Sequence, residues 1–446
     1  MNKATYHLIT LGCQMNKADS ERLASYLDSV GYSESAQPET ARLVVFITCG
    51  VRQSAEDRVY GRVNQLRKKN PQALIVITGC LAYRPDVQRR LKGQVDLFMN
   101  INRLPELVEL LAAKTNPDRV VVPESMDYEA ERQEHGEEYL KIPAHYQSAY
   151  TAYVPIGNGC DNFCSYCVVP YARGREVYRP AEEVLAEVKK LLSAGYKEIN
   201  LIAQNVNSYR SGDYNFPRLL KEVADLPGDF WVRFSSSHPK DLSPELIEVI
   251  ATSEKVVNHL HLAVQSGDDD ILKAMNRNYT VAHFKDLIAR LRAARPKMAI
   301  TTDVIVGFPG ETEEQFNNTV KLFAEENFDL VYISRYSPRP GTASWKMADN
   351  VSSIEKKRRE KILNDKLLAG SLETNKKRIG EEVIVLVDGQ NDDGRYYGKS
   401  ADYKTIFFTA STEATDLIGN FVTVLINDAL PFGLNGVLKE DANSAV

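Results

Sequence analysis

The chain has 446 residues, which suggests about three domains of roughly 150 residues each. Its net charge is −5, from 55 basic and 60 acidic side chains, so overall charge does not indicate a nucleic-acid partner and any RNA contact must come from local basic patches. The longest apolar runs have the length of strands, and no signal segment is seen, so the composition predicts a cytoplasmic protein without a membrane-spanning part.

The first part of the chain repeats one unit, in which a strand-like segment ends beside a cysteine. Residues 6–11 lead to Cys13, residues 43–48 to Cys49 and residues 73–78 to Cys80. Helical patterns between these strands predict an α/β domain with a doubly wound parallel sheet over residues 1–118. Because ligands bind such sheets at the carboxyl ends of the strands, we expect the three cysteines to meet at one edge. One such cysteine is usually a small core residue, but three at equivalent positions are better explained as the ligands of an iron–sulfur cluster.

A linker is predicted at residues 119–145, since residues 111–150 show no clear period and residues 124–138 are polar. Beyond it, strand–helix alternation resumes over residues 146–376 and predicts an open, partial (β/α)6 barrel. Sites in β/α barrels lie at the carboxyl ends of the strands, where this sequence places several polar residues. The candidate strands are residues 151–156, 198–203, 231–236, 259–264, 299–306 and 330–336.

Half of the six cysteines lie within eight residues, as Cys160, Cys164 and Cys167 in a C-x3-C-x2-C run. Three thiolates on a 4Fe–4S cluster leave one iron without a protein ligand, and a chelating small molecule can bind there. The alternative is a structural zinc site, which needs a fourth cysteine or histidine close by, whereas the nearest histidine in the sequence, His145, lies outside the run. Disulfides are less expected, because nothing marks the chain for secretion.

The last section begins with a charged helix over residues 355–378, with nine basic and four acidic side chains. A solvated helix face and an RNA contact both explain this pattern. Short strands then follow at residues 382–387, 394–398, 405–409, 421–426 and 437–438. They predict a small OB-like β-barrel at residues 377–441, which is a common platform for nucleic acids.

The cysteine run, with an aromatic residue at Tyr166, resembles the motif of radical S-adenosylmethionine (SAM) enzymes. Along nearly its whole length the chain resembles the methylthiotransferase family, and within it the tRNA enzymes that act on isopentenyl-adenosine. The C-terminal barrel resembles the TRAM domain, which binds RNA. The segments that carry the resemblance are residues 12–16 (GCQMN), 159–164 (GCDNFC), 204–209 (QNVNSY), 238–241 (HPKD), 265–267 (QSG) and 307–311 (GFPGE).

The resemblance implies insertion of a methylthio group at carbon 2 of isopentenylated adenosine next to the anticodon. It implies two 4Fe–4S clusters, on Cys13, Cys49 and Cys80 and on Cys160, Cys164 and Cys167, together with SAM. It also implies a tRNA anticodon stem-loop and a reductant protein of flavodoxin or ferredoxin type as partners of a monomeric enzyme. The residues proposed to contact SAM are Tyr166, Asn205, Ser235, Gln265 and Asp303.

Three alternatives remain open: a related enzyme acting on threonylcarbamoyl-adenosine in tRNA, one acting on a ribosomal-protein side chain, and a non-enzymatic iron–sulfur protein that binds RNA. Arg173 and Arg175 follow the cysteine run and are candidates for RNA phosphate contacts or for a solvated pair. His238 is equally a structural histidine or a site residue.

Three positions depart from the family pattern. Ile47 stands where asparagine usually precedes Thr-Cys, Ala263 where proline is usual, and Asn278 where a smaller or basic residue is common. All three neighbour the chemistry without being ligands, so they bear on substrate detail more than on the class of reaction.

Overall fold

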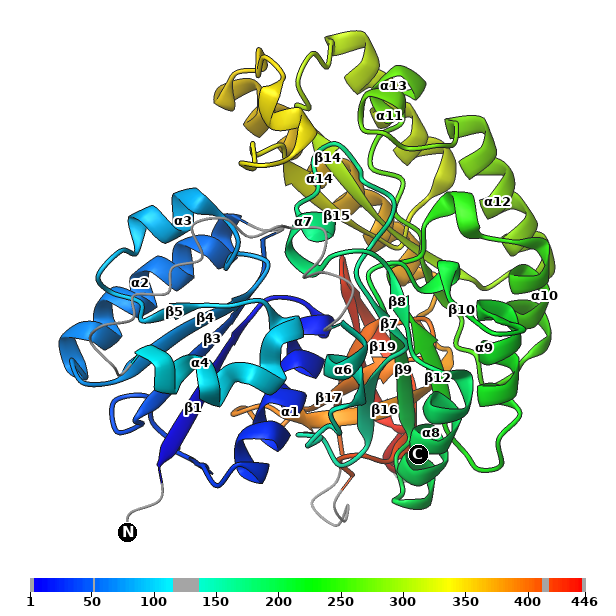
Figure 1. The fold of residues 1–446 in the computed structure, drawn as a ribbon. Helices are drawn as coiled ribbons and strands as arrows, with labels where there is room; N and C mark the ends of the chain where they lie inside the picture. Colours follow the sequence, from blue (N-terminus) through cyan, green and yellow to red (C-terminus); the bar gives the residue numbers. More distant parts are fainter. Residues whose placement is uncertain (1–3, 51–52, 115–135, 411–416, 443–446) are drawn as a thin grey trace.

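The computed structural model describes residues 4–50, 53–114, 136–410 and 417–442. Three bodies follow one another along the chain: a parallel sheet flanked by helices, a partial barrel and a small closed barrel (Figure 1). No helix in these described ranges is long and apolar enough to cross a membrane.

The first body is a five-stranded parallel sheet with strand order β2-β1-β3-β4-β5. The order reverses between β1 and β3, which confirms the predicted doubly wound sheet. β3 and β4 are almost entirely buried because hydrophobic clusters cover both faces of the sheet. Two strands of two residues each, β2 and β5, are too short to produce a sequence period. The strands are β1 (Thr5–Leu11), β2 (Ser33–Glu34), β3 (Leu43–Thr48), β4 (Leu74–Gly79) and β5 (Leu97–Phe98).

Helices connect these strands and cover the sheet. One of them, α6, lies inside the range 119–145 that the sequence suggests as a linker, and its Tyr139 and Leu140 are buried in the hydrophobic cluster of the first sheet. Most of the polar run 124–138 lies outside the described residues. The helices of this part are α1 (Gln14–Ser29), α2 (Gln53–Lys69), α3 (Pro85–Arg90), η1 (Ile101–Glu106), α4 (Leu107–Lys114) and α6 (Gly136–Lys141).

The second body contains six parallel strands that follow one another in space as in sequence. Two three-stranded halves, β6-β9-β12 and β13-β14-β15, are joined by a bridge between Ser237 and Leu262. This arrangement confirms the partial (β/α)6 barrel. The strands are β6 (Thr151–Pro155), β9 (Glu198–Ile202), β12 (Trp231–Phe234), β13 (His259–His261), β14 (Ala299–Val306) and β15 (Leu330–Arg335).

Amphipathic helices cover the outer face of the barrel, as Figure 1 shows for α9, α10, α12 and α13. The helices are α7 (Val169–Arg173), α8 (Ala181–Ser193), α9 (Phe216–Ala224), α10 (Pro244–Thr252), α11 (Asp269–Ala274), α12 (Val281–Ala294), α13 (Glu313–Glu326) and α14 (Ser353–Lys376). Short elements complete the loops: β7 (Gly157–Asn158), β8 (Val177–Tyr178), η2 (Val206–Ser208), β10 (Arg210–Ser211), β11 (Tyr214–Asn215), η3 (Pro239–Asp241) and η4 (Ala343–Lys346).

Strands β12 and β13 end earlier than the sequence suggests. β12 stops at Phe234 and β13 at His261, because the chain then leaves the regular ladder and makes single bridges only. Ser236 and Gln265 have positive φ angles of 68° and 72°, which a regular strand does not allow. The predicted strand ends thus become loops at the carboxyl end of the barrel.

The third body is a closed barrel of order β16-β17-β18-β20-β19, as predicted. β20 is longer than expected because its glycines, which suggested a turn, are accommodated beside β18 and β19. The elements are β16 (Glu382–Gln390), β17 (Tyr396–Ser400), β18 (Thr405–Thr409), β19 (Phe421–Leu430), β20 (Gly433–Leu438) and α15 (Lys439–Ala442).

The turn between β17 and β18, residues 400–404, enters the amino end of the partial barrel; we call it the capping turn. Arg233 of β12 donates to the carbonyl oxygen of Ser400 at 2.7 Å, and the Tyr403 ring stacks on His259, the first residue of β13, at 4.7 Å. Lys404 pairs with Asp329 at 2.9 Å. The closed barrel therefore seals the partial barrel at the end opposite to its loops.

Candidate active site

The three N-terminal cysteines follow β1, β3 and β4 and meet at the carboxyl edge of the sheet, as predicted. A hydrogen bond with Cys49 and the positive charge of Arg173 lower the pKa of Cys13, an exposed residue, to about 6. Burial raises the pKa of the Cys80 thiol. A Cβ placed on Gly50 would lie 3.0 Å from the Cβ of Cys80, so the chain packs closely between the cysteines.

Asn16 fixes the position of Cys13. Its side-chain oxygen accepts a hydrogen bond from the Cys13 backbone N–H at 3.1 Å, and its amide donates to the Thr48 carbonyl oxygen at 3.3 Å. The start of α1 is thereby tied to the end of β3. This contact explains the spacing of residues 12–16, since an asparagine three residues after the cysteine reaches back to cap the helix.

The second cysteine trio lies in the loop between β7 and α7. Each thiol accepts one hydrogen bond: Cys160 from Asn162 at 3.5 Å, Cys164 from Arg277 at 3.5 Å and Cys167 from the backbone N–H of Val169 at 3.4 Å. Burial raises the pKa of Cys160 to about 12 and also raises the pKa of Cys167. A metal centre here must therefore displace the thiol protons when it binds.

The N-terminal trio lies beside the residues that follow the second trio, where the parallel sheet contacts the partial barrel. Val168 and Ala172, on either side of the start of α7, pack directly against Cys80. A Cβ on Gly50 would lie 2.9 Å from the Cγ2 atom of Val168, so a larger residue beside Cys49 would push the loops apart. Residues next to one trio are thus in van der Waals contact with residues next to the other trio.

Arg173 is buried at this contact, so its predicted role as an RNA phosphate contact is wrong. Its guanidinium pairs with the buried Asp19 of α1 and donates to Asn158 at 3.1 Å, while Tyr139 donates to the same carboxylate. A buried ion pair that loses one partner typically costs about 3–5 kcal/mol. Arg173 therefore holds α7 and α1 together.

Arg175 lies two residues further on and differs from Arg173. Its side chain is 53% exposed, pairs with Asp161 at 3.0 Å and lies over the Phe163 ring at 5.3 Å. Its contact with RNA stays a prediction.

The residues proposed for SAM come from the carboxyl half of the partial barrel. Asn205 follows β9, Ser235 follows β12, Gln265 follows β13, and Asp303 lies within β14. Tyr166, from the cysteine loop, packs in a hydrophobic cluster with Phe308. The structure thus arranges all five around the same end of the barrel, and their contact with SAM stays a proposal.

Four of these residues already have polar partners. The Asn205 amide donates to the Asp241 carboxylate at 2.8 Å. Ser235 donates to the Gln14 side chain at 2.9 Å, which connects the barrel to the residue next to Cys13. Asp303 interacts with the Nε2 atom of His261 at 3.0 Å. Gln265 is held by backbone hydrogen bonds on both sides in its strained conformation.

Several buried polar atoms at this end lack a protein partner. They include the side-chain oxygens of Gln204, Asn205 and Ser237, which follow β9 and β12. Unpaired polar groups of this kind are costly unless a ligand or water satisfies them. They fit a polar ligand such as SAM.

The donor chemistry also fits iron–sulfur clusters. No three cysteine, histidine or acidic side chains among the described residues converge closely enough to share one metal ion. A four-iron cluster does not require such convergence, because each thiolate binds a different iron atom. Both cysteine trios thus suit a cluster.

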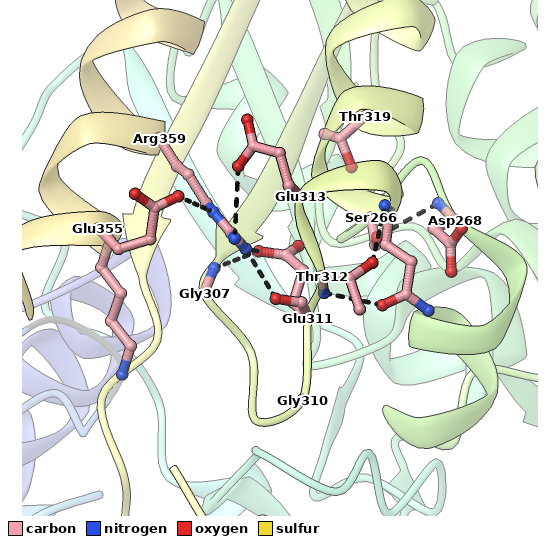
Figure 2. A network of polar contacts seen from close by, with 12 residues as sticks. Ser266, Asp268, Gly307, Gly310, Glu311, Thr312, Glu313, Thr319, Glu355 and Arg359 are labelled. Carbon is pink, nitrogen blue, oxygen red and sulfur yellow. Dashed lines mark hydrogen bonds and ion pairs between the residues drawn. The ribbon is translucent and has the colours of Figure 1, made fainter. Parts of the chain in front are cut away.

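The segment 307–311 forms a tight loop after β14 (Figure 2). Gly307 has a φ of +70°, and a Cβ there would lie 2.3 Å from Lys356, so only glycine fits. The buried carboxylate of Glu311 accepts from the Gly307 backbone N–H at 2.6 Å and from Arg359 at 2.6 Å. Burial raises the pKa of Glu311 despite these donors.

The start of the charged helix α14 supports this loop. Lys356 and Arg359 are buried, and Lys356 pairs with Asp349 at 2.6 Å. These two cations lie in the protein interior. They therefore belong neither to a solvated helix face nor to an RNA contact, the two explanations that the sequence offered for this charged helix. His238 is also structural: its Nδ1 atom accepts from the Lys240 backbone N–H, and burial lowers the pKa of His238 to about 2.

Sequence reasoning did not identify Arg277 and Tyr279 as site residues. Arg277 contacts Cys164, and the Tyr279 hydroxyl donates to the Val264 carbonyl oxygen at 2.7 Å, next to Gln265. The sequence feature that could have identified them is that they flank Asn278, one of the three positions that depart from the family pattern. Ala263, another of them, accepts hydrogen bonds from both side chains through its carbonyl oxygen.

Three known protein families match successive segments of the chain, in the same order as the three parts of the fold. Residues 5–100 match the uncharacterized protein family UPF0004, residues 154–323 the Radical SAM superfamily and residues 376–439 the TRAM domain. Membership of the radical SAM superfamily implies SAM and a 4Fe–4S cluster as cofactors.

Solved structures show the same fold at low identity. The radical SAM methyltransferase TsrM from Kitasatospora setae matches with a TM-score of 0.58 and 14% identity, over 88% of this chain and 81% of that one. The cobalamin-dependent SAM radical enzyme OxsB matches with a TM-score of 0.51 and 12% identity, over 82% and 56% of the two chains.

Relatives with much higher identity match from end to end. The tRNA-2-methylthio-N(6)-dimethylallyladenosine synthase of Carboxydothermus hydrogenoformans is 38% identical over 98% of this chain and 100% of the relative. The enzyme of the same name from Moorella thermoacetica is 39% identical over 98% and 99%, and that from Yersinia pestis is 38% identical over 97% and 92%. The chain therefore belongs to the tRNA-2-methylthio-N(6)-dimethylallyladenosine synthase family.

Proposed function

We propose that this chain replaces the hydrogen on carbon 2 of an isopentenylated adenosine, next to the anticodon of a tRNA, by a methylthio group. The observation that carries the proposal is the packing of Cys80, from the first trio, against Val168 and Ala172, which follow Cys167 of the second trio. A purine carbon offers neither an acidic proton nor a leaving group, so this replacement needs a radical and a sulfur source in one site.

When bound, SAM and a reduced cluster held by the barrel trio would supply radical chemistry that removes an unreactive hydrogen. A second cluster held by the N-terminal trio would supply the sulfur, and a second SAM molecule would supply the methyl group. The protein holds the two centres at a fixed separation. Arg173 and Asp19 fix α7 on α1. Tyr166, Asn205, Ser235, Gln265 and Asp303 orient SAM in the proposal. The closed barrel covers the opposite, amino end of the partial barrel.

The proposal includes partners. The TRAM barrel contributes to binding of the tRNA anticodon stem-loop, in a cytoplasmic, monomeric enzyme. An external reductant protein of flavodoxin or ferredoxin type delivers the electron that each radical step consumes.

A product assay tests the function. Reconstituted protein, SAM, a chemical reductant and an isopentenylated anticodon stem-loop are expected to yield a nucleoside in which one methylthio group replaces one hydrogen, detected by mass spectrometry. A chain with Cys160, Cys164 and Cys167 changed to alanine serves as the control and should give no product. Modification of a ribosomal protein, with none of the stem-loop, would contradict the proposal.

Iron analysis tests the number of clusters. Anaerobic reconstitution is expected to load about eight irons per chain, because each cysteine trio can hold one four-iron cluster. The alanine variant of either trio should hold about half of this amount. Four irons together with zinc in well-folded wild-type protein would contradict the second cluster.

A further inference from the structure

The three thiols of the barrel trio have hydrogen-bond donors of different kinds. Asn162 and the backbone N–H of Val169 lie within two residues of the thiols that they contact, and both are neutral. Arg277 is charged and lies 113 residues from Cys164 in the chain. A donor of this kind is brought to the sulfur by the fold and not by the local loop.

The Arg277 side chain is held on every branch of its guanidinium group. One nitrogen donates to the Cys164 sulfur at 3.5 Å, a second donates to the Ala263 carbonyl oxygen at 2.5 Å, and the Nε atom donates to the Tyr279 hydroxyl at 3.0 Å. The residue is 7% exposed. Its orientation is therefore fixed before any cluster binds.

In the described part of the chain, the groups that hold Arg277 include no carboxylate. The Tyr279 hydroxyl and the Ala263 carbonyl are neutral, so these partners do not cancel the guanidinium charge. Coulombic interactions are stronger in the interior than in water, so the charge acts on the nearby thiolate with little screening. Reduction adds negative charge to a cluster, and a fixed positive charge favours the reduced state.

We propose that Arg277 is a positioning residue that raises the reduction potential of the cluster on Cys160, Cys164 and Cys167. Hydrogen bonds to the sulfurs and local charge are known to set the potentials of iron–sulfur clusters. The same side chain joins Cys164 to Ala263, two residues before Gln265, and so ties the cluster loop to a segment proposed to contact SAM. This inference rests on the proposed function, because it assumes that the barrel trio holds a cluster.

The test measures the midpoint potential of the cluster by a redox titration followed by EPR spectroscopy. The full-length chain with Cys13, Cys49 and Cys80 changed to alanine is used, so that only the barrel trio can hold iron. In this background Arg277→Gln is expected to shift the potential to a more negative value, and Arg277→Lys to shift it less. Arg175→Gln is the matched control, since it removes an exposed arginine near the same loop, and it should leave the potential unchanged.

A second readout separates the potential from a general loss of structure. In the wild-type cysteine background, Arg277→Gln should cleave SAM slowly with dithionite, and cleavage should recover with the stronger reductant titanium(III) citrate. Iron loading equal to that of the parent, with an unchanged potential, would overturn the inference. If Arg277→Gln loads no iron, the second neutral variant Arg277→Met is titrated in its place, and a potential equal to that of the parent overturns the inference as well. Absence of iron in the parent itself would instead contradict the proposed function.

Discussion

Replacing Cys13, Cys49 and Cys80 together by alanine is expected to leave reductive SAM cleavage measurable and to abolish the methylthio product. In the proposed function, radical generation belongs to the barrel trio, whereas sulfur delivery belongs to the N-terminal trio. The thiols of the barrel trio keep their own hydrogen-bond donors, so their site does not depend on the replaced cysteines. One reaction mixture allows both measurements: released 5′-deoxyadenosine by chromatography and modified nucleoside by mass spectrometry.

The matched control changes Cys160, Cys164 and Cys167 and should lose both products. Cys80 packs against Val168 and Ala172, so thermal unfolding should be compared to show that the smaller alanine side chain has not separated the two bodies. Methylthiolated tRNA from the N-terminal triple variant would show that this trio is not the source of sulfur.

A prenylated anticodon stem-loop is expected to be turned over far better than the same stem-loop without the prenyl group. Burial of five carbons, at about 0.8 kcal/mol each, favours the modified base by up to roughly 4 kcal/mol. This free energy corresponds to a factor of roughly 1,000 in kcat/KM. Drawing an anticodon-loop base out of its stack adds only a few kcal/mol for either substrate, because the loop is already partly unstacked.

The measurement compares kcat/KM for the two synthetic stem-loops. A third stem-loop with threonylcarbamoyl-adenosine is the control for substrate class, because its carboxylate would need a cation in place of an apolar pocket. Equal turnover of the first two, or preference for the third, would contradict the choice of substrate and leave the reaction class intact.

The sequence predicted the parts of the fold that depend on local patterns. Residues 43–47 of β3, for example, form a continuous apolar run. The topology of a doubly wound sheet then places the cysteines that follow its strands at one edge. Helix α6 was not predicted, because it has only six residues, three of them buried, and therefore shows no usable period. The ends of β12 and β13 were placed too late, since the positive φ angles of Ser236 and Gln265 leave no signature in residue type.

The errors at the site have a different origin, which is long-range pairing. Arg173 and Arg175 look alike in the sequence, but only Arg173 meets a carboxylate in the interior, and that carboxylate, Asp19, lies 154 residues away. Arg277 likewise contacts Cys164 across 113 residues. A single sequence does not specify such distant partners, so any arginine near a loop is predicted to lie at the protein surface.

The capping turn makes the closed barrel a structural part of the partial barrel and not a separable domain. Without it, Arg233 would lose the backbone oxygens that it binds, and the ring of His259 would lose the aromatic surface that covers it. Deletion of the closed barrel would thus expose the amino end of the partial barrel to solvent. A loss of turnover in the shortened enzyme would therefore not by itself measure how much the closed barrel contributes to RNA affinity. A substitution of an exposed cation next to the closed barrel, such as Lys439→Ala in α15, leaves the capping turn in place. Such a variant tests a tRNA contact without disturbing the partial barrel.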